Sequence, residues 1–325
     1  MYDVITVGSA TFDVFAKTDS ELITIRTNNS TEELIAYPSG SKILMKNLDF
    51  CVGGGGTNTA VAISKLGLKT AYLGNIGKDD HGRKVMELLK KEKVDFLGTI
   101  TEDMTNYSII LDSIGEDRTI LVYKDASEKL DYKKIDMERL ITRWFYFCAL
   151  EVKTLEKFTE YAKKHGIKIA FNPSNYLAEK GSDYLKNILE NTELLILNDE
   201  EAKLLVGNAP IPISLDRLSK LGPKIVAITS GAKGADILYN DVIYHTNGLN
   251  CKVVETTGAG DTFGASFLSG FLIKNSVEFA LKLGIANATS VITHEGPSKR
   301  LLSLKEAENY ILKKRIEVKK INLIK

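Results

Sequence analysis

Short apolar runs alternate with helical patterns along this chain, and that alternation constrains the fold more than any other feature. The runs at residues 4–7, 70–74, 168–171, 194–197 and 224–229 have the length and composition of buried strands. Helical patterns lie at 83–93, 155–164, 200–205, 215–221, 261–274, 277–293 and 304–314. Strands that alternate with helices in this way predict an α/β fold with a mostly parallel central sheet and helices on both faces.

Two early segments break this alternation. Residues 21–52 hold strand-like pieces without a convincing helix, and residues 107–124 resemble two strands around a turn at Gly115-Glu116-Asp117. Together they form either a small separate sheet that would act as a lid over a cleft, or a pair of hairpins on the edge of the main sheet. We predict a single domain over residues 1–325 with a discontinuous β lid from 21–52 and 107–124. The basic end, 313–325, is expected to be a solvated tail.

The composition excludes several classes of protein. Its 43 basic and 42 acidic residues give a net charge of +1 without a polybasic stretch, so neither nucleic acid nor a membrane surface is expected as a partner. The apolar runs are too short to cross a bilayer, and the N-terminus lacks the charged start of a signal peptide. Cys51, Cys148 and Cys251 are odd in number and lack metal-ligand spacing, which is typical of a protein in the reducing cytoplasm.

The first of two glycine-rich motifs contains four consecutive glycines, 53–56. Without side chains there, a ligand can approach the main chain closely. Asn58 then opens a helix of small residues that ends at Gly67, a suitable residue to follow a helix. A dinucleotide site is disfavoured, because neither Gly53 nor Gly54 begins a Gly-x-Gly-x-x-Gly pattern. Taken alone, the motif predicts a tight turn into a helix, with or without a ligand.

The second motif lies where an apolar strand ends and a helix begins, at or just before Asp261. Free amides at a helix N-terminus bind anions, and Gly258, Ala259 and Gly260 would present theirs without obstruction. Asp261 beside such an anion site either caps its helix, which aspartate does well, or has a chemical task.

The two motifs in this order resemble the ribokinase family, also called the phosphofructokinase-B group of carbohydrate and nucleoside kinases. Its signatures are the early Gly-Gly-x-Gly-x-Asn and the late Thr-Thr-Gly-Ala-Gly-Asp. Further matches are Gly8-Ser9-x-x-x-Asp13, Gly77-x-Asp79-x-x-Gly82, Asn198-x-x-Glu201, Thr229-x-Gly231-x-x-Gly234 and Ala286-Asn287-Ala288. The resemblance therefore covers almost the whole chain, and it implies phosphate transfer from ATP to an alcohol.

The resemblance implies a catalytic role for the late motif. Asp261 would deprotonate the attacking hydroxyl, and Gly258, Ala259 and Gly260 would form the anion hole for the phosphoryl group. This agrees with the chemistry, because phosphoryl transfer is catalysed chiefly by positioning and by stabilisation of charge.

The resemblance also implies a nucleotide and metal site. Asn198 and Glu201 match the motif that organises Mg²⁺ and its waters around the phosphates of ATP. Thr229, Gly231 and Gly234 match the nucleotide loop. In the same way, Asn287 matches a helix position that lines the adenine pocket.

Substrate contacts are implied at Asp13, Gly54, Gly55 and Asn58, and less directly at Glu151, which follows an expected strand. Asp13 could hold two sugar hydroxyls, with Asn58 as donor and acceptor beside it. Gly55 departs from the ribokinase pattern itself, in which a longer polar side chain occurs, so the resemblance does not specify D-ribose. Glu255 also departs, because the family usually has an aspartate that helps to hold a monovalent cation such as K⁺. The longer carboxylate either retains that metal role or displaces the ion.

The leading hypothesis is an ATP-dependent kinase that phosphorylates a primary alcohol of a sugar or a sugar-like molecule. A nucleoside kinase is the alternative, with Phe12, Tyr37 and Tyr107 as aromatic partners for a base. A non-catalytic sugar-binding or regulatory protein is a more distant reading, since a pure binder has no use for a base such as Asp261. A homodimer is expected through apolar residues of the lid, among them Ile23, Leu34, Ile109 and Leu121.

Overall fold

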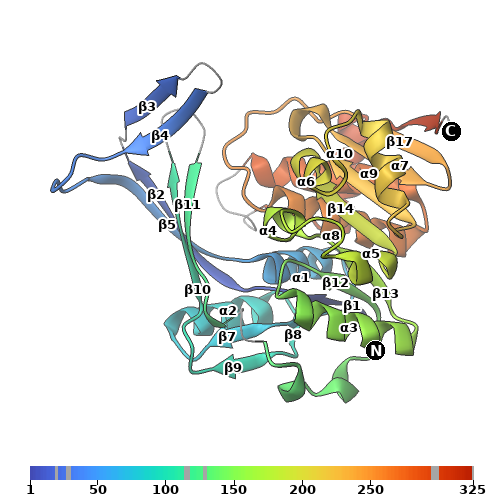
Figure 1. Ribbon diagram of the computed structural model, residues 1–325, viewed down its shortest axis with the longest axis horizontal. Coiled ribbons are helices and arrows are strands. Elements are labelled where there is room, and N and C mark those ends of the chain that lie inside the picture. The colour runs from blue at the N-terminus through green and yellow to red at the C-terminus, as the bar shows by residue number, and fades with distance from the viewer. Residues whose placement is uncertain (19–20, 27–30, 113–117, 127–129, 294–299, 324–325) are drawn as a thin grey trace.

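The main sheet has ten strands in the order β18-β17-β16-β15-β14-β13-β12-β1-β6-β8 (Figure 1). The computed structural model describes residues 1–18, 21–26, 31–112, 118–126, 130–293 and 300–323. The parallel strands are β1 (Tyr2–Val7), β6 (Thr70–Leu73), β8 (Asp95–Phe96), β12 (Thr142–Phe147), β13 (Lys168–Phe171), β14 (Leu194–Asn198) and β15 (Ile225–Thr229). Antiparallel strands β16 (Ala235–Tyr239), β17 (Val242–Thr246) and β18 (Lys319–Asn322) extend one edge.

Helices cover both faces of this sheet. One face carries α1 (Gly55–Lys65), α2 (Asp80–Lys91), α8 (Ala259–Lys274) and α9 (Val277–Ile292), with α10 (Leu304–Lys314) packed against α9. The other carries α3 (Val152–His165), α4 (Ser174–Ala178), α5 (Lys186–Glu190), α6 (Asp199–Val206) and α7 (Ile211–Ser219). The expected α/β fold with a mostly parallel sheet is therefore confirmed.

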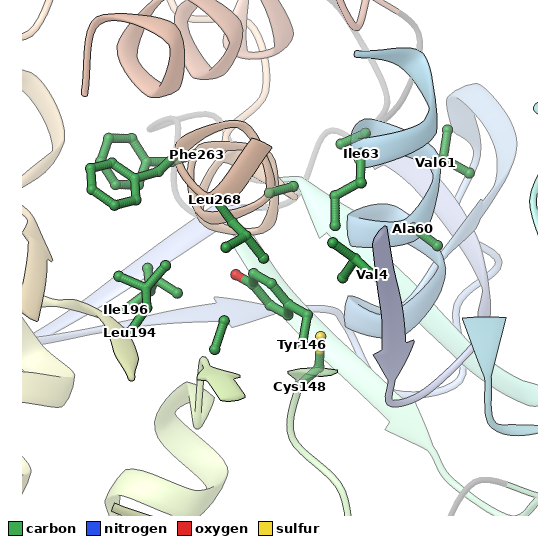
Figure 2. Packing of buried hydrophobic residues seen from close by; sticks show 14 of the residues in the cluster. Val4, Ala60, Val61, Ile63, Tyr146, Cys148, Leu194, Ile196, Phe263 and Leu268 are labelled. Carbon is green, nitrogen blue, oxygen red and sulfur yellow. The ribbon is translucent and has the colours of Figure 1, made fainter. Parts of the chain in front are cut away.

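Alternate side chains of each buried strand divide the core into two apolar clusters. On β12, Trp144 and Tyr146 face the cluster under α1 and α8, whereas Phe145 and Phe147 face the cluster under α3. Figure 2 shows the first cluster, with Tyr146 directed towards α8. Because β12 is buried on both faces, its apolar residues are continuous and not alternating.

A separate four-stranded sheet projects from the body in the order β11-β10-β2-β5 (Figure 1). It consists of β2 (Thr11–Thr18), β5 (Met45–Gly53), β10 (Asn106–Asp112) and β11 (Arg118–Tyr123), and we call it the small sheet. Hairpin β3 (Glu21–Arg26) and β4 (Thr31–Ala36) forms its own two-stranded sheet, as do β7 (Asn75–Gly77) and β9 (Thr99–Thr101). Short 3₁₀ turns are η2 (Tyr132–Lys134), η3 (Met137–Arg139) and η4 (Gly231–Lys233).

Three expectations about the two early segments and the basic end need correction. Both early segments lie outside the main sheet, so the alternative of edge hairpins is wrong. The small sheet includes β2, which the sequence pattern did not reveal, while the turn expected at 115–117 lies outside the described residues. The basic end is not simply a solvated tail, because β18 pairs with β17 at the edge of the main sheet.

The small sheet is attached to the body at α2. Phe12 of β2 stacks on His81 of α2 with ring centroids 4.3 Å apart, and Tyr107 of β10 lies 5.3 Å from the same ring. Asp79 caps α2 by accepting from the amide of Gly82 at 2.7 Å, and it also accepts from the amide of Thr105 at 2.8 Å, just before β10.

Among the described residues, every helix is too short or too polar to cross a membrane.

Candidate active site

The first turn of α8 lies between two cavities. The first cavity, of about 460 Å³, is lined by Asp261 and Gly55 together with residues from the ends of β12 and β13. The second cavity, of about 510 Å³, is lined by Ala259 and Gly260 together with the loops that follow β15 and β17. Consecutive residues in one turn of α8, Gly260 and Asp261, therefore line two different cavities.

The backbone at Gly258 explains why the helix begins here. Gly258 has a left-handed conformation with φ of 77°, which glycine adopts without strain. The amide of Ala259 donates to the carbonyl of Thr256 at 3.2 Å, and the first turn of α8 has further amides without an acceptor inside the helix. A side chain at Gly260 would meet nothing within 4 Å, so its Cα borders open space. This turn can therefore receive an anionic group from the second cavity.

Asp261 is held by the early motif. Its Oδ2 accepts a hydrogen bond of 3.0 Å from Nδ2 of Asn58 in α1. Burial raises the pKa of Asp261 above its ordinary value, and the hydrogen bond from Asn58 opposes that rise. A carboxylate with a raised pKa is a stronger base, provided that it is still ionised.

The early glycines allow a close approach between α1 and the strands β1 and β2. Gly54 has φ of 94°, and a side chain there would come within 2.6 Å of the carbonyl of Ser9. A side chain at Gly53 would overlap the carboxyl group of Asp13. These glycines therefore make room for Asp13 and bring Gly55 to the wall of the first cavity.

Asp13 lies on β2 of the small sheet. It is only 6% exposed, and Oδ1 accepts a hydrogen bond from the hydroxyl of Ser108 on β10. Burial raises the pKa of Asp13 to about 6, against the lowering effect of Ser108. The negative charges of Asp261 and Glu255 raise this pKa further, so both carboxylates are close enough to Asp13 to affect its ionisation.

Glu151 precedes α3 and lines the first cavity. Its Oε2 accepts a hydrogen bond of 3.0 Å from the hydroxyl of Thr154. This contact fixes one carboxylate oxygen and leaves the side chain at the cavity wall. The structure therefore brings Gly55, Glu151 and Asp261 together on one cavity.

Asn198 and Glu201 form a reciprocal cap at the start of α6. Oδ1 of Asn198 accepts from the amide of Glu201 at 2.8 Å, and Oε2 of Glu201 accepts from the amide of Asn198 at 2.8 Å. Glu201 is only 6% exposed, and burial raises its pKa, with a further contribution from the charge of Asp261. Neither residue is among the described residues that line the two cavities.

The described residues contain no cluster of three or more His, Cys, Asp or Glu side chains able to hold a metal. Mg²⁺ in phosphate-transfer sites keeps several waters and uses one or two carboxylates plus the phosphates themselves. One carboxylate, such as Glu201 near Asp261, fits that mode of binding.

Thr229, Gly231 and Gly234 line the second cavity. Gly234 has φ of 96°, and a side chain there would overlap the carbonyl of Thr246. Asn287, in contrast, is fully buried and does not line this cavity among the described residues. Its Nδ2 donates to Oγ of Ser266 at 2.9 Å and its Oδ1 accepts from the amide of Leu302 at 2.9 Å, so its role is to join α8 to the segment before α10.

Glu255 is 9% exposed and faces Thr257. Its Oε1 accepts from the amide of Thr257 at 2.7 Å and from the hydroxyl of the same residue at 2.6 Å.

Several lining residues were not found from the sequence. In the first cavity these are Ser9, Lys124, Cys148, Asn172, Ser174 and Tyr176. Cys148 and Asn172 directly follow β12 and β13, and residues at the carboxyl ends of parallel strands commonly line ligand sites. In the second cavity, Phe263 and Ile285 provide apolar walls from α8 and α9.

Comparison with known proteins identifies the family of this chain. The family model described as pfkB family carbohydrate kinase matches residues 3–303. An uncharacterised sugar kinase of Archaeoglobus fulgidus is 29% identical over 243 residues, which cover 73% of this chain and 96% of that protein. The ribokinase of Haemophilus influenzae is 24% identical over 304 residues, which cover 89% of this chain and 98% of that protein.

A solved structure shows the same fold. Ribokinase of Arabidopsis thaliana, complexed with ribose and ATP, superposes with a TM-score of 0.81 at 20% identity, over 95% of this chain and 98% of that one. Because the family model spans residues 3–303, this chain belongs to the pfkB family of carbohydrate kinases.

Proposed function

We propose that this kinase transfers the γ-phosphate of ATP to a hydroxyl of a sugar or sugar-like molecule. The reacting hydroxyl is a primary alcohol. The observation that carries the proposal is the position of α8, whose first turn borders both cavities. Gly260 borders the second cavity and the next residue, Asp261, borders the first. A phosphate donor and a hydroxyl acceptor would therefore meet at adjacent residues.

ATP would occupy the second cavity. Thr229, Gly231 and Gly234 form one side of it, and Phe263 and Ile285 give it apolar walls suited to a base. The phosphates would extend towards the first turn of α8, where amides and the positive end of the helix dipole favour negative charge. The solved ribokinase complex with ATP supports this choice of donor.

The acceptor would occupy the first cavity, with its reacting hydroxyl at Asp261. The carboxylate takes the hydroxyl proton while the oxygen bonds to the γ-phosphorus, and the bond from that phosphorus to ADP breaks. The amides at Gly258, Ala259 and Gly260 stabilise the charge of the transferring group. Asp13, Asn58 and Glu151, with the backbone at Gly54 and Gly55, would bind the other hydroxyls.

Glu201, oriented by Asn198, would hold Mg²⁺ through water, and the ion would offset phosphate charge. Glu255 would lie beside a monovalent cation such as K⁺. Its Oε1 is directed to Thr257, which supports a weak requirement for that ion.

A nucleoside acceptor has less support from the aromatic residues named for it. Phe12 and Tyr107 pack against His81, and the hydroxyl of Tyr37 pairs with that of Thr18 at 3.0 Å. The rings of Phe12 and Tyr107 therefore already have a partner in the body, and the hydroxyl of Tyr37 has one in the small sheet. A sugar is therefore the favoured acceptor.

The small sheet would act as the lid, and the protein would form a homodimer through it. Large apolar side chains are exposed on this sheet, including Phe50 at 54%, Leu121 at 53% and Val122 at 56%. Large exposed apolar side chains on a small sheet favour an interface. The chain has only three cysteines in 325 residues, a low and odd number that supports a cytoplasmic location.

ADP release tests the proposed function. The purified protein is mixed with ATP, Mg²⁺ and a panel of sugars, sugar acids and nucleosides. Release that depends on a sugar or sugar acid is expected. Release that depends only on nucleosides, or on no acceptor, would contradict the proposal.

A further inference from the structure

Lys124 brings a positive charge from the small sheet to the first cavity. It directly follows β11, and its Nζ lies 4.0 Å from the ring centroid of Tyr176 in α4. The next residue, Asp125, fixes the backbone there, because its amide donates to Oδ1 of Asn106 at 3.1 Å. Among the described residues, no carboxylate forms an ion pair with Lys124.

The wall around Lys124 is rich in hydrogen-bond donors. Ser174 and Tyr176 line the same cavity, and within the described residues neither hydroxyl has a hydrogen-bond partner. Ser174 has φ of 52°, an uncommon conformation for serine, and its amide donates to Oδ1 of Asn172 at 3.1 Å. Backbone strain of this kind is often retained where it serves a site.

Charged side chains of both signs line the first cavity. Of its described lining residues, Lys124 alone is basic, whereas Glu151 and Asp261 are carboxylates. A neutral sugar would leave the ammonium group at the cavity wall without a counter-charge. A carboxylate on the acceptor would supply one negative charge, whereas a dianionic phosphate would add charge near Glu151 and Asp261.

We infer that Lys124 makes this kinase selective for a sugar acid, a polyhydroxylated chain that carries one carboxylate. The carboxylate binds Lys124, with the hydroxyls of Ser174 and Tyr176 as additional donors. The alcohol at the other end of the chain reaches Asp261. This inference rests on the proposed function, because it requires the first cavity to be the acceptor site.

Paired acceptors of equal chain length test the selectivity. The full-length protein is assayed for ADP release with D-gluconate and D-glucose, with D-ribonate and D-ribose, and with glucose 6-phosphate. The wild type should prefer at least one sugar acid to its neutral partner. Lys124→Met should lower kcat/KM for that acid by about tenfold to a hundredfold, mainly through KM, because hydrogen bonds to charged groups contribute on that scale.

Control variants separate charge recognition from a structural link. Lys180 also lies over the Tyr176 ring, at 5.7 Å, but it is not among the described residues that line the cavity. Lys180→Met should therefore leave both kcat/KM values unchanged, and Lys124→Arg should retain most of the selectivity. Melting temperatures establish that the variants are folded.

Three results would overturn the inference while the proposed function stands. They are equal or better turnover of the neutral sugars by the wild type, an equal loss for acid and neutral acceptor in Lys124→Met, and a preference for glucose 6-phosphate. The second would mean that Lys124 only joins the small sheet to the body. No transfer to any sugar or acid would overturn the proposed function and this inference with it.

Discussion

Asn58 of α1 donates a hydrogen bond of 3.0 Å to Oδ2 of Asp261 in α8 and so joins two residues that are 203 positions apart in the sequence. The bond directs the carboxylate towards the wall of the first cavity. It also favours the ionised form of Asp261 against the effect of burial. The two glycine-rich motifs thus meet at the atom that would accept the proton.

Asp261→Asn should remove most of the turnover and leave nucleotide binding intact. The amide cannot accept the hydroxyl proton, and general-base contributions are typically about 10²–10⁴-fold in rate. ADP release measures the loss, and the rise in melting temperature with ATP measures binding. Asp80→Asn is the control, since Asp80 is also in the first turn of a helix but is exposed on α2. More than about a third of the activity in Asp261→Asn would contradict a role as base.

Gly260→Val should impair the reaction without destabilising the fold. A side chain at Gly260 would meet no protein atom within 4 Å, so it would occupy space in the second cavity that the phosphates need. Gly264→Ala, one turn later, should have the opposite profile. Its new methyl group would overlap the hydroxyl of Tyr146, and overpacking of this kind costs about 1–3 kcal/mol. Normal ATP binding and turnover in Gly260→Val would contradict the proposed anion hole.

Potassium should stimulate the wild type only weakly. Oε1 of Glu255 is directed to Thr257, and the extra methylene relative to aspartate moves the carboxylate by about 1.5 Å. Glu255→Asp should increase the stimulation, measured with KCl against choline chloride at equal ionic strength. Wild-type stimulation above about tenfold that Glu255→Ala abolishes would show that the glutamate itself holds the ion.

Leu121→Asp should convert the expected dimer into a monomer. Leu121 is 53% exposed on β11, and a charge there would be costly in an apolar interface. Leu312→Asp is the control, because Leu312 is 75% exposed on α10 of the body. Light scattering coupled to size exclusion gives the mass of each variant. A wild-type monomer, or a Leu121→Asp dimer, would contradict assembly through the small sheet.

The sequence predicted those features that depend on the backbone conformation of single residues. Gly54 and Gly258 both require positive φ, and each stands at the start of a helix that the glycine motifs predicted. The strand β2 was missed because Thr11–Thr18 follows β1 so closely that only its pairing with β5 and β10 identifies it. Those partners come from distant parts of the chain.

Side-chain direction was harder to predict than position along the chain. Asn287 precedes Ala288, which lines the second cavity, but one residue turns an α-helix by about 100°, and that rotation places Asn287 in the core. Lys124 carries no motif. It reaches the first cavity only because the small sheet packs on α2, a tertiary relationship that no local pattern encodes.

Asp13→Asn should make the protein more stable near pH 7.5 and a poorer enzyme. Burial raises the pKa of Asp13 to about 6 in the folded protein, whereas the ordinary value of 3.8 applies when it is unfolded. Between these values the folded state binds the proton more readily, so stability falls as pH rises from about 4 to 6. Above pH 6 the ionised carboxylate remains a cost to folding, which asparagine removes.

The gain should be about 1–3 kcal/mol in free energy of unfolding at pH 7.5 and should vanish towards about pH 3, where aspartate is largely protonated in both states. Urea unfolding at several pH values measures it. Asparagine still accepts from Ser108, so that hydrogen bond is retained. KM for the acceptor should rise, because an amide binds sugar hydroxyls less strongly than a carboxylate does. A variant less stable than the wild type at pH 7.5, or with an unchanged KM, would contradict the view that Asp13 is kept charged for the acceptor at the expense of stability.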